Sequence, residues 1–580
     1  MAPEWSVMPE TNINIPLLIV GGAVILVAII YFAATYKRRK DRTLSARVLS
    51  SFGAVPKREY TQEELEKIAK YQEIVHEEGV FSIDDITWND LHMDTAFAQM
   101  NHTFSSMGEE ELYRILREPL MEPEALQERK RVIHWFEENE YARTEFQKEY
   151  VKIGRTRKVS LAETLQDFDK LNLKPDAVYL IPLALILAAV AVTIFFPTAG
   201  IMAIIAAVIM NLVLYYKVKA ILGAYYTSLA AVSHAVRSGE RILKVSAPAG
   251  LEAYLSELED ALKPLKAIKR DDRFLGASMS TVVSSNPLHI IMDYLRMMTH
   301  LDFIAFNHMV KVVVREHDSI LRTVHILGYL EAMISIASYR QTLPFYTEGE
   351  VGAGERGQMP SLNAKDLYHP LLSNPVANSI HTERPVLITG SNASGKSTFL
   401  RTTAFAALMA QTTCTVCANE YEAPAFRLFS SMALSDSMET GESYYVVEIR
   451  SIKRVLDQSR AEGAPVLVFV DEVLRGTNTV ERIAASSQIL KDLAERKVLV
   501  FAATHDVELT SLLGGYYMNK HFDEEILDGE VRFSYILKDG RATTRNAIRL
   551  LSVMGYDEEI IDRAEETAEH FSKDNEWVLY

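Results

Sequence analysis

The sequence predicts a multidomain protein: an N-terminal transmembrane helix, an all-α region interrupted by a transmembrane hairpin, and a C-terminal α/β domain with a phosphate-binding loop. Three observations predict this fold class. Two long apolar stretches occur in the first 220 residues, helical periodicity surrounds the second of them, and short β-branched runs alternate with helical stretches after residue 346. At 580 residues the chain is too long for one hydrophobic core.

The bulk composition limits the classes of partner. The net charge is −16, from 77 acidic and 61 basic residues, so the chain as a whole is not attracted to nucleic acid or anionic lipid. Any contact with DNA must therefore be local. Two cysteines in a chain of this size argue against a disulfide framework and favour a reducing compartment. We expect most of the folded mass to lie in the cytoplasm.

The first segment, residues 1–40, contains the first predicted membrane span. Ile15 to Tyr36 is an uncharged apolar run of about 22 residues, which is enough to cross a bilayer as a helix. A basic cluster, Lys37 to Lys40, follows it, whereas a signal peptide would begin with basic residues and end in a cleavage site. The pattern predicts an anchor in the cytoplasmic (inner) membrane, with the rest of the chain on the cytoplasmic side.

A second apolar block, residues 177–216, predicts a membrane hairpin. Pro197 to Gly200 divide it into spans of about 20 and 16 residues. Lys174 before the block and Lys217 after it place both ends on the side of the first basic cluster, so three spans share one topology. The alternative is a buried helical hairpin in a soluble core, because the second span is short and contains Asn211.

The remaining segments are predicted from periodicity. Residues 41–176 and 217–345 place apolar residues three and four apart, which predicts two parts of one helical region. A Gly- and Glu-rich connector near residue 350 opens the last domain, residues 346–580. Its apolar runs Val386 to Thr389, Val466 to Val470 and Val498 to Ala502 predict strands of a mainly parallel sheet, and residues 546–571 predict a C-terminal helical pair.

The first of these strands leads into a motif that predicts ATP binding. GSNASGKS follows the strand, opens a helix and matches G-x-x-x-x-G-K-[ST] in its required context. Its glycines let backbone N–H groups approach phosphate, Lys396 reaches the β- and γ-phosphates, and the Ser397 hydroxyl can ligate Mg²⁺. The residues expected to bind nucleotide are Gly390, Ser391, Asn392, Ala393, Ser394, Gly395, Lys396, Ser397 and Thr398.

Two carboxylates and a histidine are predicted at the same sheet edge. Asp471 and Glu472 end the second strand, and His505 follows the third. Ligands bind at the carboxyl ends of parallel strands, so we expect Asp471 to hold Mg²⁺ and Glu472 to act as a general base on water. His505 can sense the γ-phosphate. An ordinary acidic strand end and a structural histidine are the alternatives.

Together with DEVLRGTNT at 471–479 and GESYYVVE at 441–448, these motifs resemble the MutS family of mismatch-repair ATPases. The resemblance implies a homodimer with composite ATP sites, in which Ser443 acts on the neighbouring subunit's nucleotide and Asn392 helps to place the γ-phosphate or the water. It also implies that Tyr535 contacts adenine, whereas Val376 stands where a second aromatic residue is usual. The catalytic set is thus Glu472, His505, Asn392 and Ser443.

The helical region also resembles the core of this family, through the stretch from Asn101 to Arg129 and the helix over 326–338. The departures concern DNA: no N-terminal mismatch-reading domain and no Phe-x-Glu wedge is found, and the apolar hairpin stands where the family inserts its DNA clamp. Our hypothesis is that a membrane-inserted hairpin takes the place of the DNA clamp in this chain. DNA binding is then supported by the resemblance alone.

Three functions remain open from the sequence. The first is a membrane-anchored, dimeric MutS-like ATPase switch that by resemblance binds DNA. Its alternative is an ATP-driven switch for a membrane or protein complex that does not bind DNA. The second is a transporter motor, against which stand only three spans and no L-S-G-G-Q signature. The third is a scaffold that binds ATP without cycling, which Glu472 and His505 disfavour. Cys414 and Cys417 have zinc spacing but no second pair, so we predict no zinc.

Overall fold

The computed structural model describes residues 31–32, 35–36, 38–156, 160–171, 173–246, 249–268, 297–353, 358–391, 394–432, 444–475, 477–527, 530–542, 548, 551, 554–574 and 577. The chain divides into two compact units, residues 1–52 and 53–580. In the first unit the described residues up to 51 are helical. Most of the predicted span Ile15 to Tyr36 lies outside the described residues.

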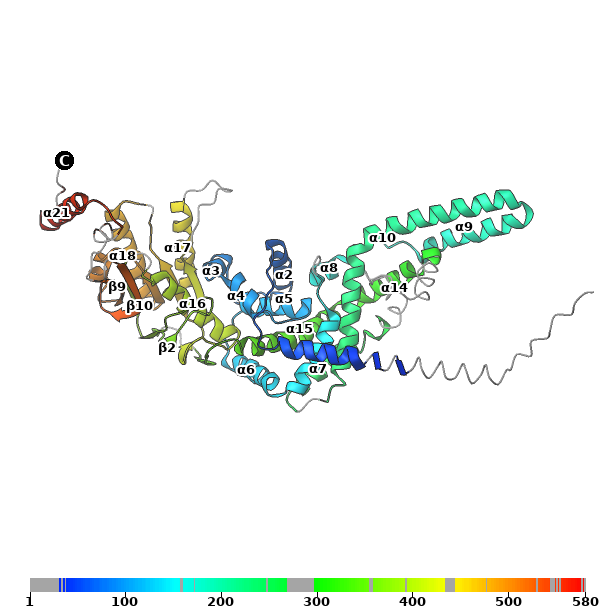
Figure 1. Cartoon of the computed structure of the whole chain (residues 1–580), viewed down its shortest axis with the longest axis horizontal. Coiled ribbons are helices and arrows are strands. Elements are labelled where there is room, and N and C mark those ends of the chain that lie inside the picture. Colours follow the sequence, from blue (N-terminus) through cyan, green and yellow to red (C-terminus); the bar gives the residue numbers. More distant parts are fainter. Residues whose placement is uncertain are drawn as a thin grey trace, which may run out of the picture. The chain divides into compact units, whose positions relative to one another are not determined.

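The second unit begins with a helical region that is built around one long buried helix. Its helices are α2 (Gln62–Val75), α3 (Asp85–Asp90), α4 (Met93–Met100), α5 (Ser106–Arg117), α6 (Pro123–Glu138), α7 (Glu140–Ile153), α8 (Leu161–Asp167), α11 (Glu252–Leu262), α14 (Leu301–Arg315) and α15 (His317–Arg340). Helix α15 packs against α5, α6 and α11 (Figure 1). Nearly all of its last 15 residues are buried, so α15 forms the centre of this core.

Two glycines allow α5 and α15 to approach closely. A Cβ atom on Gly328 of α15 would lie 2.6 Å from the Met107 carbonyl oxygen of α5, and one on Gly108 would overlap the Glu331 side chain. Glu331 is buried and accepts hydrogen bonds from the backbone N–H groups of Phe104, at 2.5 Å, and Ser105, at 3.1 Å. The core is therefore closed by close backbone packing and by one buried carboxylate whose partners are fixed.

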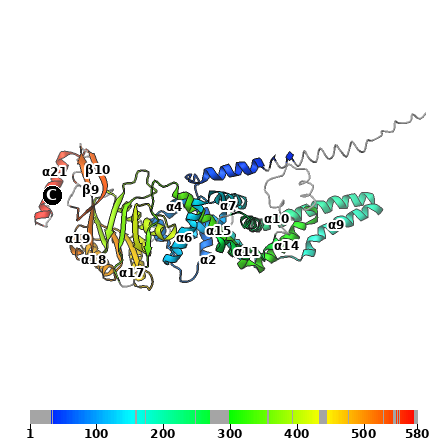
Figure 2. The same cartoon turned by 90° about the horizontal axis from the view of Figure 1, so that it is seen from below.

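The apolar block forms a helical hairpin of α9 (Asp176–Phe195) and α10 (Pro197–Ile242), which lie side by side (Figures 1 and 2). The turn is shorter than the sequence predicted, because Pro197 takes the first helical position, where its missing N–H costs nothing. A Cβ atom on Gly200 would collide with the backbone of Thr193, so a glycine is needed where the two helices cross.

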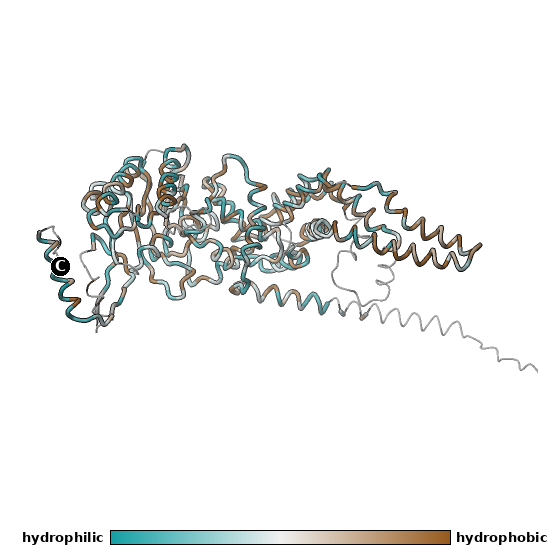
Figure 3. Tube along the Cα trace, turned by 90° about the horizontal axis from the view of Figure 1, so that it is seen from above, coloured by the Kyte–Doolittle hydropathy of each residue, from teal (hydrophilic) through white to brown (hydrophobic). Residues whose placement is uncertain are grey.

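Helix α10 continues past the predicted end of the hairpin at residue 216. The sequence becomes more polar at Lys217, but no helix-stop signal occurs there. One helix of 46 residues therefore runs from the apolar hairpin into the helical core. Its first part is apolar, as the brown tube in Figure 3 shows, and many of its large apolar side chains are exposed. Its second part packs against α7, α8 and α15. The hairpin is thus continuous with the helical core.

Three described helices are long and apolar enough to cross a membrane: α9, residues 197–223 of α10, and α15. The three helices differ in how much of each is buried inside the protein. In the most apolar stretch of α15, 78% of residues are buried inside the protein, against 17% in α9 and 22% in α10. Burial explains the apolar character of α15, whereas most of the apolar surface of the hairpin has no protein cover in the described residues.

The C-terminal region is an α/β domain with two sheets. Its mainly parallel sheet has the strand order β10-β9-β4-β8-β7-β6, in which only β10 is antiparallel to its neighbour. The strands are β4 (Val386–Thr389), β6 (Arg427–Ser431), β7 (Val466–Asp471), β8 (Leu499–Ala503), β9 (Met518–Leu527) and β10 (Glu530–Asp539). The central strands β4, β7 and β8 are buried along their whole length, as strands covered on both faces must be.

The α/β region also contains a smaller sheet and several helices. A smaller sheet has the order β1-β5-β2-β3, with β1 (Glu350–Gly352), β2 (Leu362–Leu367), β3 (Asn378–Thr382) and β5 (Glu420–Pro424). The helices are α16 (Lys396–Thr412), α17 (Tyr444–Arg460), α18 (Thr479–Glu495), α19 (Glu508–Leu512) and α21 (Glu558–Asp574). The described structure therefore contains a helical region and an α/β region, as the sequence predicted.

Buried polar contacts join the helical region to the α/β region. The Asp90 carboxylate of α3 accepts hydrogen bonds from the Ser430 hydroxyl, at 2.5 Å, and the Met432 N–H, at 2.9 Å, at the end of β6. Arg340, the last residue of α15, donates to the Cys414 carbonyl oxygen at 2.7 Å, just beyond α16. Cys414 and Cys417 are both buried thiols. The end of α15 is thus bonded to the segment that follows α16.

Candidate functional site

The glycine-rich loop has a backbone that only glycine accommodates easily. Gly390 and Gly395 have φ angles of +149° and +112°. A Cβ atom on Gly390 would lie 2.7 Å from the Phe522 carbonyl oxygen, and one on Gly395 would lie 3.3 Å from the Tyr535 ring. Gly395 is the N-cap of α16, so the N–H groups of the first turn are left for a ligand. Asn392 and Ala393 lie outside the described residues.

The loop lysine is turned inward. Lys396 is 5% exposed, and its Nζ atom donates to the carbonyl oxygens of Gly390 and Ser391, at 2.7 Å each. Burial lowers the pKa of Lys396, while the nearby Asp471 and Glu472 carboxylates act in the opposite direction. Ser394 also faces inward: its Oγ atom is buried and makes no hydrogen bond within the described residues. Both polar groups suit a ligand with negative charge.

The acidic pair ends β7, next to β8. Asp471 is buried, and Glu472 follows it with a φ angle of +59° and a backbone N–H that donates to the Ala503 carbonyl oxygen at 2.9 Å. One Glu472 carboxylate oxygen lies 2.6 Å from His505 Nε2, and the other lies 2.6 Å from Arg475 Nε. The carboxylate is therefore held from both sides.

These neighbours determine the protonation state of Glu472. Burial by itself would raise the pKa of Glu472, but the hydrogen bond and charge of His505, with the charges of Arg475 and Lys396, lower it below its usual value. Glu472 is thus ionised at neutral pH, the state in which a carboxylate can accept a proton.

A cavity of about 690 Å³ connects the loop with these groups. It is lined by Leu367, His369, Leu372, Ser373, Asn374, Pro375, Val376, Asn378, Ser391, Gly395, Lys396, Ser397, Thr398, Phe399, Thr402, Glu472, Arg475, His505, Phe522 and Tyr535. The set includes five of the predicted loop positions, both predicted catalytic residues that are described, and Tyr535. Asp471 is not part of the lining. Ser443 lies outside the described residues.

Tyr535 reaches the cavity because β10 is irregular there. The register between β10 and β9 shifts between Phe533 and Leu537, and Tyr535 has a φ angle of +55°. Asn378 of β3 bridges this bulge: its Nδ2 atom donates to the Tyr535 carbonyl oxygen at 2.9 Å, and its Oδ1 atom accepts from the Leu537 N–H at 2.7 Å. Val376 lines the same part of the cavity.

Sequence reasoning missed three residues that shape the site. Asn378 is 157 positions before Tyr535, and no local pattern connects them. Glu524 of β9 accepts a hydrogen bond from the hydroxyl of Ser391 in the glycine-rich loop. Glu448 of α17 accepts from the backbone of the segment that follows Glu472. The motifs at 441–448 and 471–479 contained Glu448 and Arg475, but spacing alone did not assign either a contact.

By fold and site, this is an α/β domain of the kind that binds a ligand at the carboxyl ends of its parallel strands. Comparison with known proteins defines it further. Residues 386–572 match the family model for MutS domain V. The α/β region is therefore similar to domain V of the MutS family.

Curated relatives agree with this assignment over part of their length. The chain is 28% identical over 344 residues to the DNA mismatch repair protein MutS of Thermotoga petrophila, which covers 56% of this chain and 40% of the relative. It is 34% identical over 180 residues to the protein of the same name from Thermus thermophilus, covering 31% of this chain and 22% of the relative. The chain thus spans less than half the length of these relatives.

Proposed function

We propose that this protein is a membrane-anchored MutS-like ATPase, which binds and hydrolyses Mg-ATP at the cavity and uses the cycle as a conformational switch. One observation carries the proposal. The cavity brings together the lysine of the glycine-rich loop and an ionised glutamate that is held between Arg475 and His505.

The residues present fit Mg-ATP. The two loop glycines lie where a side chain would fill the cradle, and the buried Ser394 hydroxyl is without a partner in the described residues. Lys396 donates to two loop carbonyl oxygens that a phosphate can replace. Tyr535 offers a ring for stacking on a base. Ser397 and Asp471 would hold Mg²⁺, which when bound neutralises charge on the phosphate oxygens.

Each side chain then has one task in hydrolysis. Lys396 exchanges its two loop carbonyl oxygens for phosphate oxygens and keeps its charge in a buried position. Glu472 accepts a proton from the attacking water, and the fixed contacts of Arg475 and His505 orient its carboxylate. Phosphoryl transfer depends mostly on such positioning and on charge stabilisation. Asn392 and Ser443 would complete the site, the latter from the partner subunit of a homodimer.

Membrane anchoring is supported by the surface of the hairpin. Large apolar side chains on α9 and the first part of α10 are exposed, among them Ile194, Phe195, Phe196 and Met202, each at 66% or more. Water would make this surface costly, since each such side chain gains about 1.5–3 kcal/mol on full burial. We place the hairpin in the cytoplasmic membrane and the α/β domain in the cytoplasm.

DNA binding is the less supported half of the proposal. The name of the relatives speaks of DNA mismatch repair, but the hairpin occupies the part of the helical region where the resemblance would place the clamp. An ATP-driven switch for a membrane or protein complex that does not bind DNA is therefore the second candidate, and the exposed apolar hairpin favours it.

ATP hydrolysis by the full chain in detergent or in lipid nanodiscs tests both candidates. The rate is measured alone and with homoduplex, mismatched and branched DNA, with Glu472→Gln as the blank. Stimulation by one DNA structure supports a DNA-handling switch, and hydrolysis indifferent to every DNA supports the second candidate. A wild-type rate equal to that of the blank would refute the proposed activity.

A further inference from the structure

Glu448 is a buried carboxylate that the hydrolytic mechanism above does not use. It lies in the first turns of α17 and is 2% exposed. Its Oε1 atom accepts the N–H of Leu474 at 2.5 Å and the N–H of Arg475 at 3.2 Å. Its Oε2 atom makes no hydrogen bond within the described residues. A polar group buried this deeply is costly unless it is hydrogen-bonded, and the bonds to Oε1 meet that condition.

The segment that Glu448 holds has a strained backbone. Glu472 and Leu474 have φ angles of +59° and +61°, a region that bulky side chains rarely adopt. Such a residue costs on the order of 1–3 kcal/mol and persists only where its surroundings enforce it. Contacts that hold this backbone include the two hydrogen bonds to Glu448, the bond from the Glu472 N–H to Ala503 at 2.9 Å and the bond from the Ser486 hydroxyl to the Val473 carbonyl oxygen at 3.2 Å.

The held segment ends at the residue that touches the catalytic carboxylate. Glu448 bonds the backbone of Arg475, and the Arg475 side chain lies 2.6 Å from one Glu472 oxygen, while His505 lies 2.6 Å from the other. A shift of the 474–475 backbone would therefore move the guanidinium and rotate the carboxylate toward His505. Sub-ångström placement of such groups decides how fast they act.

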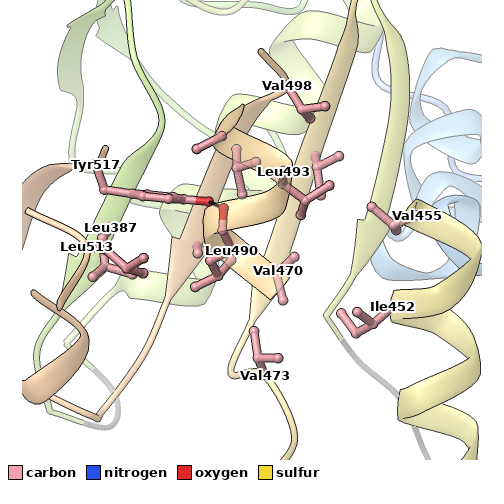
Figure 4. Close-up of a cluster of buried hydrophobic side chains, with 14 of the residues drawn as sticks. Leu387, Ile452, Val455, Val470, Val473, Leu490, Leu493, Val498, Leu513 and Tyr517 are labelled. Carbon is pink, nitrogen blue, oxygen red and sulfur yellow. Dashed lines mark hydrogen bonds between the residues drawn. The ribbon is translucent and has the colours of Figure 1, made fainter. Parts of the chain in front are cut away.

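Helix α17, which carries Glu448, is held in place by packing in a buried apolar cluster. Ile452 lies four residues after Glu448, so both face the same side of the helix. Figure 4 shows Ile452 and Val455 of α17 in the buried apolar cluster that also holds Val470 and Val473, on either side of the acidic pair. The helix and the segment after β7 thus share one core, and Glu448 makes the polar contact between them.

We propose that Glu448 is a positioning residue for Glu472: it fixes the backbone at Leu474 and Arg475, and through Arg475 it sets the orientation of the Glu472 carboxylate. This inference rests on the proposed ATPase function. Glu448 is not itself one of the residues that line the cavity, and it contacts the lining through the Arg475 backbone. Its loss is expected to slow the chemical step and to leave nucleotide binding intact.

The test uses the full chain in detergent, with kcat and KM for ATP, equilibrium binding of a fluorescent ADP analogue and thermal unfolding measured for each variant. Glu448→Ala removes the acceptor, and Glu448→Gln keeps a neutral acceptor oxygen. Ser451→Ala is the matched control, because Ser451 lies on the same helix, is buried, and has an Oγ atom without a hydrogen bond in the described residues. The double variant Glu448→Ala/Glu472→Gln tests whether Glu448 acts through Glu472.

We expect Glu448→Ala to lower kcat by about 10- to 100-fold, with KM and ADP affinity within about threefold of wild type. Glu448→Gln should restore kcat to within about threefold, Ser451→Ala should match wild type, and the double variant should be no slower than Glu472→Gln alone. An unchanged kcat in Glu448→Ala, or an additional loss in the double variant, would overturn the inference. If wild type itself does not hydrolyse ATP, the proposed function fails instead.

Discussion

A buried glutamate in α5 makes the helical core sensitive to pH. Glu110 is buried, and its Oε2 atom makes no hydrogen bond within the described residues. Burial raises the pKa of Glu110 from 4.5 to about 8, and the neighbouring Glu109 carboxylate adds to this rise. At neutral pH the folded protein therefore keeps a proton on Glu110 that the unfolded chain would release.

The sign of the effect follows from this difference. The folded state binds the extra proton between about pH 4.5 and pH 8, so stability is greatest at the acidic end and falls as pH rises. Each pH unit costs about 1.4 kcal/mol, which gives a total of at most about 5 kcal/mol for a shift of this size. The side chain in Glu110→Gln carries no charge at any pH. The stability of this variant relative to wild type should therefore increase between about pH 4.5 and pH 8 and level off above that range.

Hydrogen exchange of α5 amides is the appropriate assay, because a chain of several regions does not unfold in one step. Wild type and Glu110→Gln are compared at about pH 5 and about pH 9, so that the intrinsic exchange chemistry cancels at each pH. Glu111→Gln, at the adjacent position, is the control, because it should change the protection of the α5 amides in the opposite direction. Burial would raise the pKa of Glu111, but Arg114 and His325 lower it, so its loss should reduce protection at neutral pH. An advantage of Glu110→Gln that is equal at both pH values would refute the reasoning.

Three further predictions concern the site and the core. Lys396→Met should abolish binding of a fluorescent ATP analogue while leaving thermal unfolding within a few degrees of wild type; an unchanged affinity would contradict the assignment of the loop. Asn378→Ala removes both hydrogen bonds that hold the bulge at Tyr535, at about 0.5–1.5 kcal/mol per lost bond, so nucleotide affinity should fall by at least about fivefold; Tyr535→Ala measured alongside should weaken binding at least as much. Gly328→Ala forces α15 away from α5 and should cost about 1–3 kcal/mol, seen as a lower melting temperature of the full chain.

The sequence predicted the α/β region well because its signals are local. Each buried parallel strand is a continuous apolar run, and the three predicted strands begin or end within one residue of β4, β7 and β8. The glycine-rich loop also follows from local chemistry, since its positive φ angles require glycine at two fixed positions. Motif and geometry coincide there.

The remaining features depend on contacts between distant residues. The sequence placed the end of the hairpin at residue 216 because polarity changes there, but polarity alone does not stop a helix, and α10 runs to Ile242. No sequence periodicity predicts the hydrogen bond between Asn378 and Tyr535, or the one between Glu448 and the segment that follows Glu472. The roles of Asn392 and Ser443, and the span Ile15 to Tyr36, stay predictions.

In the proposed mechanism Glu472, held by Arg475 and His505, performs the chemical step at a site that binds ATP independently of it. The most direct measurement follows ATP binding and ATP hydrolysis in the same samples of full-length wild type and Glu472→Gln. We expect the variant to bind ATP as tightly as wild type, within about threefold, while hydrolysis falls by at least about 100-fold. A variant that hydrolyses ATP at the wild-type rate, or that loses binding together with hydrolysis, would contradict this mechanism.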